Sequence, residues 1–383
     1  MKNCIYFDYN ATAPVAPAVV AAMLPYLRDA QGNPSSLHWA GLPARDAVEA
    51  ARSKVAALMC CDATEVVFTS GGTEANNQAI KGWYFAARER GGPFHVITSR
   101  IEHPAVLEPC RFLESLGAEL TRLPVDRFGR VDPDDVRRAI RPSTALITIM
   151  HANNEVGTIQ PISEIAAIAR EHGVLCHTDA AQTVGKIPVD VESMGVDLLS
   201  VAGHKLYGPK GVGALFVREG LELQPLLHGA GHEAGRRAGT ENVLEIVGLG
   251  AACELAQQWI EDESVVALRD HFWRLLQARF GECVVLNGHP EQRLPNTLNV
   301  GFRAELGDAL LAGMPNVAAS TGSACHAGSM HVSPVLVEMG VPDDVARGAV
   351  RFSLGRDSTP GEIDEVVEML VQHGVSRHAT SRR

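Results

Sequence analysis

Short apolar runs alternate with helical patterns over much of this chain, and this alternation limits the possible folds more than any other feature. Apolar runs typical of buried strands lie at residues 66–69, 94–98, 145–150, 174–177, 197–201 and 214–217. Residues 45–59 and 162–172 carry apolar side chains at helical spacing. Strands that alternate with helices usually pair in parallel, so the pattern predicts an α/β fold with a mostly parallel central sheet.

The pattern changes near residue 255 and indicates a second unit. Residues 264–280 are predicted to form a long amphipathic helix. Residues 359–362 read Thr-Pro-Gly-Glu, which is a capping box with proline at the first helical position. We therefore expect a large domain over residues 15–255 and a small domain over residues 256–383, with the N-terminal segment 1–14 packing near the small one.

Charge and hydropathy exclude several classes of partner. The 383 residues include 34 Lys and Arg and 45 Asp and Glu, a net charge of −11. An acidic chain is a poor ligand for nucleic acid or for an anionic membrane surface, so neither partner is expected. No apolar stretch approaches the roughly 20 residues of a membrane span, and the first residues lack the apolar core of a signal peptide. A cytoplasmic protein is the expectation.

Polar segments follow five of the predicted strands. In chain order they read SGGTEANN, SRIEHP, HANNEVG, TDAAQ and AGHKLYGPKG. Parallel strands bring their carboxyl ends to one edge of a sheet, and ligands of open α/β sheets bind outside that edge. The sequence therefore predicts a polar binding site assembled from these segments.

Each side chain in these segments has both a functional and a structural interpretation. Gly72 and Thr73 open a helix and suit anion binding, although they also suit an ordinary helix cap. Asp179 ends an apolar strand, where it needs a cationic cofactor nitrogen, a salt bridge or a capping role. Lys205 could form a Schiff base or be a solvated surface lysine. His103 and His204 are candidate proton carriers, while the absence of metal-ligand spacing argues against a metal site.

Two further candidates lie in the last third of the chain. Cys325 stands in a run of small residues and precedes His326, a setting that favours a nucleophilic thiol over an incidental one. Arg351 lies in an otherwise apolar strand pattern. It suits capture of a substrate carboxylate, and an inter-domain salt bridge is the alternative.

Taken together, these motifs resemble the cysteine desulfurases of the NifS/IscS type. The resemblance covers nearly the whole chain and is carried by GNPSSLH, FTSGGTEANN, HANNEVG, HTDAAQ, GHKLYGPKG, RAGTEN, TGSAC and RFSLGR. It implies the fold type I of pyridoxal-phosphate-dependent transferases, with helices on both faces of the central sheet and a smaller α/β C-terminal domain. The implied cofactor is pyridoxal 5'-phosphate.

The resemblance also implies a role for each matching residue. Lys205 matches the lysine that forms the Schiff base, Asp179 the partner of the ring nitrogen and Gln182 the partner of the ring hydroxyl. His103 matches the histidine that stacks on the ring and takes part in proton transfer. The matches to the phosphate ligands are Gly72, Thr73, His204 and Thr240, the last donated by a neighbouring subunit, so a homodimer is implied. Asn154 and Arg351 match the contacts to the substrate carboxylate, and Cys325 matches the sulfur-accepting nucleophile.

The implied reaction converts L-cysteine to L-alanine and passes the sulfur, as a persulfide on Cys325, to an acceptor such as an iron–sulfur scaffold protein. One departure concerns Ala202, which stands where many desulfurases place a phosphate-binding serine. The phosphate contact there is expected to be lost, or to be replaced by Ser200 or a water molecule. Selenocysteine lyases share the fold and an apolar residue at this position, so selenocysteine stays open as substrate. An aminotransferase and a non-catalytic partner that retains the fold are the remaining alternatives.

Overall fold

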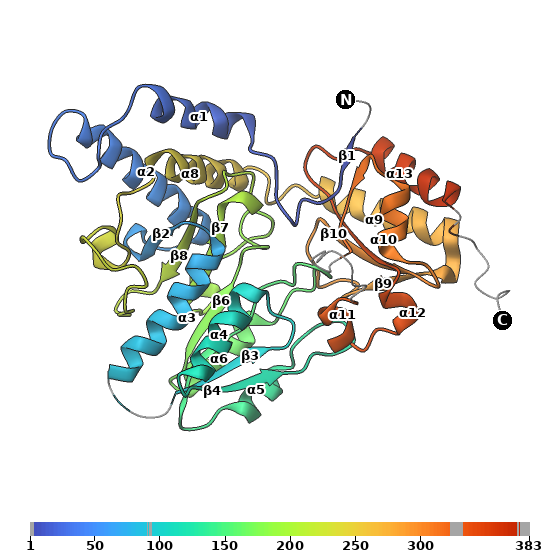
Figure 1. Cartoon of the computed structure of the whole chain (residues 1–383), viewed down its shortest axis with the longest axis horizontal. Coiled ribbons are helices and arrows are strands. Elements are labelled where there is room, and N and C mark those ends of the chain that lie inside the picture. The colour runs from blue at the N-terminus through green and yellow to red at the C-terminus, as the bar shows by residue number, and fades with distance from the viewer. Residues whose placement is uncertain (1–3, 90, 92–93, 322–331, 374, 376–383) are drawn as a thin grey trace.

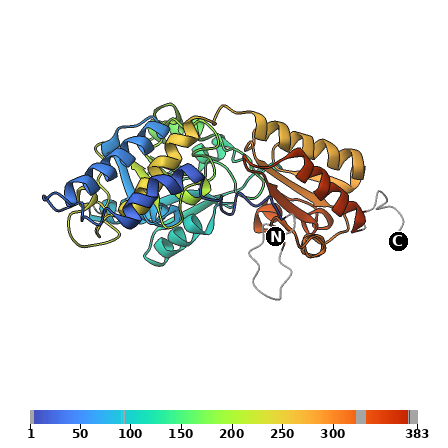
Figure 2. The ribbon, with the colours of Figure 1, turned by 90° about the horizontal axis from the view of Figure 1, so that it is seen from above.

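The chain folds into a larger and a smaller body that lie side by side, as Figures 1 and 2 show. The computed structural model describes residues 4–89, 91, 94–321, 332–373 and 375. Within these residues the larger body contains a seven-stranded sheet and the smaller one a three-stranded sheet. A short parallel pair joins β1 (Ile5–Tyr6) to β11 (Val317–Ala318), which places the N-terminal segment beside the smaller body.

The large sheet is mostly parallel, as the alternating pattern predicts. In spatial order its strands are β2 (Val66–Thr69), β8 (Gly213–Val217), β7 (Leu198–Ala202), β6 (Leu175–Asp179), β5 (Thr144–Thr148), β3 (His95–Ser99) and β4 (Glu119–Leu123). Strand β8 runs antiparallel to both of its neighbours. Two reversals restore the direction, so β2 points the same way as β7. The carboxyl ends of β2, β3, β5, β6 and β7 therefore meet at one edge.

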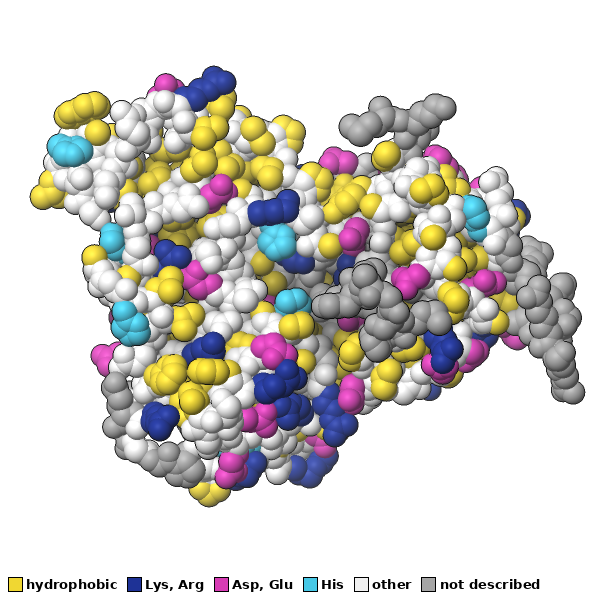
Figure 3. All heavy atoms as spheres, viewed as in Figure 1, with side chains coloured by type: hydrophobic (Ala, Val, Ile, Leu, Met, Phe, Trp, Pro, Cys, Tyr) yellow, Lys and Arg dark blue, Asp and Glu magenta, His cyan; other side chains and the backbone are white. Residues whose placement is uncertain are grey.

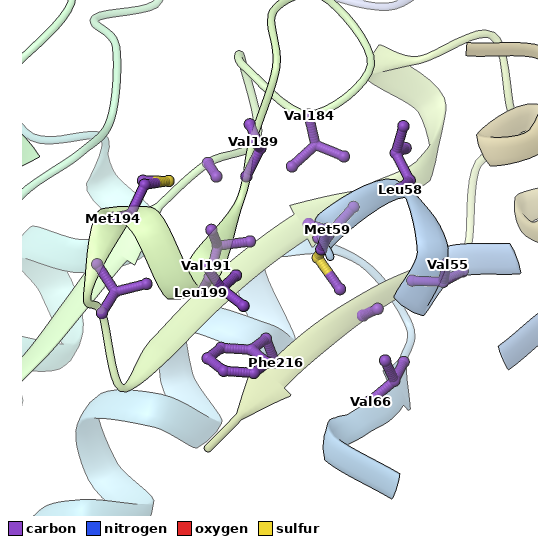
Figure 4. Close-up of a cluster of buried hydrophobic side chains, with 14 of the residues drawn as sticks. Val55, Leu58, Met59, Val66, Val184, Val189, Val191, Met194, Leu199 and Phe216 are labelled. Carbon is purple, nitrogen blue, oxygen red and sulfur yellow. The ribbon is translucent and has the colours of Figure 1, made fainter. Parts of the chain in front are cut away.

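Helices cover both faces of this sheet. On one face lie α2 (Gly41–Met59), α5 (Pro133–Ala139), α6 (Ile162–Glu171), α7 (Val191–Met194) and α8 (Val243–Gln257), with α1 (Pro17–Arg28) against α8. On the other face lie α3 (Gly72–Glu89) and α4 (Pro104–Ser115). Successive strand residues alternate between the faces: Leu199 packs with Met59 and Phe216 in the cluster of Figure 4, whereas Leu198 packs with Leu215 on the opposite side.

The smaller body is an antiparallel sheet with two long helices on one face. Its strands are β12 (Ala349–Ser353), β10 (Thr297–Phe302) and β9 (Val284–Asn287). Phe272 of α9 (Ser264–Phe280) and Ile363 of α13 (Pro360–Gln372) pack against this sheet. The predicted capping box of α13 is present, because Thr359 and Glu362 each accept the other's backbone N–H. Three short helices complete the body: α10 (Gly307–Gly313), α11 (Pro334–Glu338) and α12 (Asp343–Ala346).

Charged side chains of both signs share the surface. Around β4 and α5, Figure 3 shows cationic and anionic side chains interspersed. Several of them form ion pairs, such as Arg122 with Glu114 and Arg137 with Glu171. In the described part of the chain, no helix combines the length and the apolar character that crossing a membrane requires.

Candidate active site

A cavity of about 470 Å³ opens at the edge where the carboxyl ends of the strands meet. Its walls come from the turns after β2, β3, β5, β6 and β7, from the N-terminal segment, and from Ser320 and Arg351 of the smaller body. The cavity brings together predicted site residues from separate parts of the sequence. They are Gly72, Thr73, His103, Asn154, Asp179, Gln182, His204, Lys205 and Arg351.

Asp179 lies at the end of β6 and is 7% exposed. Its Oδ2 accepts a hydrogen bond of 2.7 Å from Asn76 Nδ2, and its Oδ1 accepts the backbone N–H of Ala181 at 2.9 Å. These donors hold the carboxylate at the cavity wall while leaving room for one more. A protonated ring nitrogen is the kind of group that such a buried carboxylate stabilises.

Lys205 ends a short 3₁₀ turn, Gly203–Lys205, directly after β7. Its Nζ donates to the carbonyl oxygens of Asn10 and Ala11, the latter at 2.8 Å. Burial, reinforced by the nearby Arg351 charge and opposed by Asp8 and Asp179, lowers the pKa of Lys205 to about 8. An amine that loses its proton this easily is suited to nucleophilic attack on a carbonyl group and to proton transfer.

His103 is the N-cap of α4. Its Nδ1 accepts the backbone N–H of Ala105 at 3.0 Å, so the ring proton of the neutral histidine sits on Nε2. Burial lowers the pKa of His103, with Asp179 opposing the shift and Lys205 adding to it. A neutral ring held by a helix cap suits both stacking on a planar ligand and proton exchange through Nε2.

Glu102, the residue before His103, is a buried carboxyl that sequence reasoning did not single out. Its carboxyl accepts the backbone N–H of Met150 at 2.9 Å and the hydroxyl of Ser99 at 2.5 Å. This contact explains why β5 ends at Thr148 rather than at the predicted residue 150, because the Met150 N–H leaves the ladder to bind Glu102. Burial raises the pKa of Glu102 to about 8.

The start of α3 provides an anion-binding corner. The helix begins at Gly72, and Thr73 adds a hydroxyl beside its free N–H groups. A Cβ on Gly72 would lie 3.1 Å from the Cβ of Ala202, so the glycine keeps the corner open. The expectation that Ser200 replaces the missing serine is wrong. Its hydroxyl is fully buried and bonded to His177 Nε2 at 3.0 Å. Ser200 lies on the same face of β7 as Ala202, but two residues further from the carboxyl end of the strand, and it does not line the cavity.

Arg351 reaches the cavity from β12 of the smaller body. One amino group donates to the carbonyl oxygen of Asn154 at 2.9 Å, and the other forms an ion pair of 2.6 Å with Asp8. Its Nε is buried and has no hydrogen-bond partner within the described residues. These two contacts hold the guanidinium at the cavity and use two of its five N–H groups. Asp8, which the sequence did not single out, occupies one amino group of Arg351, and a substrate carboxylate would compete with it for the guanidinium.

The structure does not place the other two predicted site residues, Thr240 and Cys325, in this cavity's described lining. Thr240 is exposed and lies outside its lining. Cys325 lies outside the described residues. Two residues missed by sequence reasoning, Asn10 and Asn76, do line the cavity. Both belong to polar stretches, DYNAT and EANN, but a single asparagine there gives no signal of its own.

The donor set fits pyridoxal phosphate. The N-terminus of α3, together with Thr73 and His204, suits a phosphate group, and Gly72 has no side chain that would fill the space beside it. Asp179 suits a protonated ring nitrogen at the other side of the cavity, and the easily deprotonated Lys205 suits the aldehyde.

Comparison with known proteins gives matches over nearly the whole chain. The model of the aminotransferase class-V family matches residues 5–366. A relative from Dictyoglomus turgidum, cysteine desulfurase IscS, is 50% identical over 374 residues, which cover 97% of this chain and 94% of the relative. A solved NifS-like protein superposes with a TM-score of 0.90 at 36% identity, covering 96% and 98% of the two chains. A solved structure of SspA in complex with cysteine gives a TM-score of 0.82 at 41% identity, covering 91% and 98%.

Proposed function

The chain belongs to the aminotransferase class-V family and is a pyridoxal-phosphate-dependent cysteine desulfurase, and we propose that it carries the sulfur it removes as a persulfide on Cys325. The observation that carries this reading is the convergence of Lys205, Asp179 and Arg351 on one cavity. An amine with a lowered pKa, a buried carboxylate and a guanidinium are the groups needed for an amino-acid substrate on this cofactor.

Each side chain has an assigned task in this proposal. When bound, pyridoxal phosphate supplies an electron sink for the charge left by removal of the substrate α-proton. Asp179 holds its ring nitrogen, Gln182 its ring hydroxyl, and Gly72, Thr73 and His204 its phosphate. Arg351 and Asn154 hold the substrate carboxylate.

Lys205 and His103 move protons in the proposed reaction. Lys205 takes the α-proton, and His103 exchanges a proton through Nε2. The Cys325 thiolate attacks the substrate sulfur, so an S–S bond forms as the C–S bond breaks, and a proton delivered to carbon leaves L-alanine. The persulfide then passes to a thiol or scaffold acceptor. Iron–sulfur assembly is the proposed destination, and the cytoplasm is the proposed location.

Alanine formation from L-cysteine tests this assignment. We expect wild type to form alanine and Lys205→Ala to form none, because the amine is lost. Cys325→Ala should keep the bound cofactor and lose sulfur transfer, whereas Cys60→Ala, which changes an exposed cysteine, should behave as wild type. Full turnover by Cys325→Ala would contradict the persulfide assignment. A strong preference for L-selenocysteine that survives Cys325→Ala would favour the lyase alternative.

We further propose a homodimer in which Thr240 of one copy completes the phosphate site of the other. The support is that Thr240 is exposed and lies outside the cavity of its own chain. Co-expression of Lys205→Ala with Thr240→Ala, each with its own tag, tests this idea. A mixed dimer contains one intact site, so its alanine formation should exceed that of either parent. A mixed dimer no better than the average of its parents would show that Thr240 acts in its own chain or not at all.

A further inference from the structure

Lys186 is a half-buried lysine that the proposed mechanism does not use. It lies four residues after Gln182, behind the cavity wall, and Lys186 itself is not among the residues that line the cofactor cavity. Its Nζ donates to Gln182 Oε1 and to Asn10 Oδ1, both at 2.8 Å. Burial lowers the pKa of Lys186, and the charges of Lys205 and Arg351 add to the shift. Protonated or neutral, the amine has two N–H groups for these two acceptors.

The contacts of Gln182 determine which end of its amide faces which neighbour. Its Nε2 donates to the carbonyl oxygen of Asn10 at 3.0 Å, and its Oε1 accepts from Lys186. A carbonyl oxygen only accepts, so only the Nε2 end of the amide can bind the backbone oxygen of Asn10, and Oε1 then faces the N–H groups of Lys186. The amide is therefore held in one orientation. Its oxygen is engaged behind the wall, and the second N–H of Nε2 is left for the cavity that Gln182 lines.

Asn10 braces the arrangement. Its Oδ1 accepts from Lys186 and from Asn296 Nδ2 at 3.1 Å, and its Nδ2 donates to Thr297 Oγ1 at 2.8 Å. Its backbone carbonyl oxygen accepts from both Gln182 and Lys205. Asn10 thus connects the N-terminal segment to the start of β10 and to the turn after β6, which carries Gln182.

From this network we propose that Lys186 is a positioning residue that orients Gln182 to present a hydrogen-bond donor, and not an acceptor, to the bound cofactor. The inference rests on the proposed function, since it concerns pyridoxal phosphate in this cavity. A donor at this point stabilises a cofactor oxygen in its deprotonated form. Lys186 therefore acts on the cofactor's ionisation through Gln182, without touching the cofactor.

Lys186→Met tests the proposal, because methionine keeps much of the side-chain length and removes both N–H groups. Cofactor-free protein is titrated with pyridoxal phosphate, and the visible absorbance band is followed against concentration and against pH. The dissociation constant should rise about tenfold, the size of one hydrogen bond to a charged group, and the pH midpoint of the band should move upward. Lys54→Met, which changes an exposed lysine of α2, should leave both quantities at wild-type values.

A double-mutant cycle with Gln182→Leu distinguishes positioning from a general loss of structure. If Lys186 acts through Gln182, then Lys186→Met should change the dissociation constant by less than about twofold in the leucine background. An equal loss in both backgrounds would overturn the proposal. A wild-type protein that takes up no pyridoxal phosphate would overturn the proposed function instead, whereas wild-type behaviour of Lys186→Met would overturn this inference alone.

Gln182→Glu gives a second test if Lys186→Met does not fold. Glutamate keeps the shape, pairs with Lys186 and offers the cavity an acceptor in place of the N–H. The variant loses the donor to the Asn10 carbonyl oxygen, so its urea midpoint should fall when it is cofactor-free, but it should still unfold cooperatively. It should bind pyridoxal phosphate at least about tenfold more weakly. Wild-type affinity and an unchanged absorbance band would overturn the proposal.

Discussion

At the residue scale, the properties of the site depend on burial more than on residue type. Lys205 and Lys54 are both lysines, but Lys205 is largely withdrawn from water near the Arg351 charge, and the more exposed Lys54 pairs with Glu254. Burial lowers the pKa of Lys205 to about 8 and raises that of Glu102 to about 8, since each neutral form is favoured away from water. The same physical cause thus prepares an amine to lose its proton and a carboxyl to keep one.

The lowered pKa of Lys205 predicts a pH dependence of stability. Between pH of about 8 and 10.5, the unfolded chain holds a proton that the cofactor-free folded chain has lost. The free energy of unfolding of wild type should therefore rise with pH across this window relative to Lys205→Met, by on the order of 2 kcal/mol because the group is not fully buried. Urea denaturation of both cofactor-free proteins below, within and above the window measures this difference. A constant difference would show that Lys205 titrates alike in both states.

The buried pair of Arg52 and Glu233 predicts strong coupling between two sites far apart in sequence. The guanidinium binds both carboxylate oxygens, at 2.7 and 2.8 Å, and Glu233 also accepts the backbone N–H of Phe68. Arg52→Met leaves a buried carboxylate unpaired and should cost about 3–5 kcal/mol of unfolding free energy. Arg52→Met with Glu233→Gln should cost clearly less than the sum of the single changes. Additive losses in urea denaturation would contradict this coupling.

At the element scale, periodicity located the helices and strands that contain long apolar patterns. The predicted helix 264–280 matches α9, and the strand 66–69 matches β2, residue for residue. Strand β4 was missed because it lies at the sheet edge, where its sequence ELTRL is fully buried only at Leu123 and lacks an apolar run. The apolar pattern also could not predict that β8 runs antiparallel to its neighbours, because periodicity does not show the direction of a strand.

The contact between α2 and α8 predicts sensitivity at a glycine. A Cβ on Gly250 would lie 2.7 Å from the Cα and Cβ of Ala51, so the two helices approach where only glycine fits. Gly250→Ala should lower the free energy of unfolding by about 1–3 kcal/mol through overpacking. The matched change Gly361→Ala in α13 meets nothing within 4 Å and should be neutral or slightly stabilising. Equal denaturation midpoints for the two variants would show that the helices separate at no cost.

At the scale of the whole molecule, the cavity lies where two separately packed bodies meet. The large sheet supplies Asp179 and Lys205, whereas the smaller body supplies Arg351. The ion pair of Arg351 with Asp8 and the pairing of β1 with β11 attach the N-terminal segment to the smaller body. The same segment reaches Lys205 through the carbonyl oxygen of Asn10. Substrate and cofactor therefore bind at a junction of three parts of the chain.

A ligand at this junction should stabilise the whole molecule. Pyridoxal phosphate binds the folded chain, so at a hundred times its dissociation constant it should raise the free energy of unfolding by about 2.7 kcal/mol. Thermal unfolding with increasing cofactor measures this gain, and Lys205→Ala should show a smaller one at equal concentration. An unfolding temperature that does not change when the cofactor is bound would mean that the cavity opens before the molecule unfolds.

The sequence by itself determined the α/β class, the edge of the sheet that carries the site and half of the residues that line the cavity. These properties are local, because periodicity and the residues after each strand are read from neighbouring positions. Tertiary structure decided which groups meet. Arg351 contacts Asp8 across 343 positions of the sequence. Lys186 and Asn10 hold Gln182, and burial together with distant charges lowers the pKa of Lys205. Desolvation and partner choice depend on packing in three dimensions, and no local pattern encodes them.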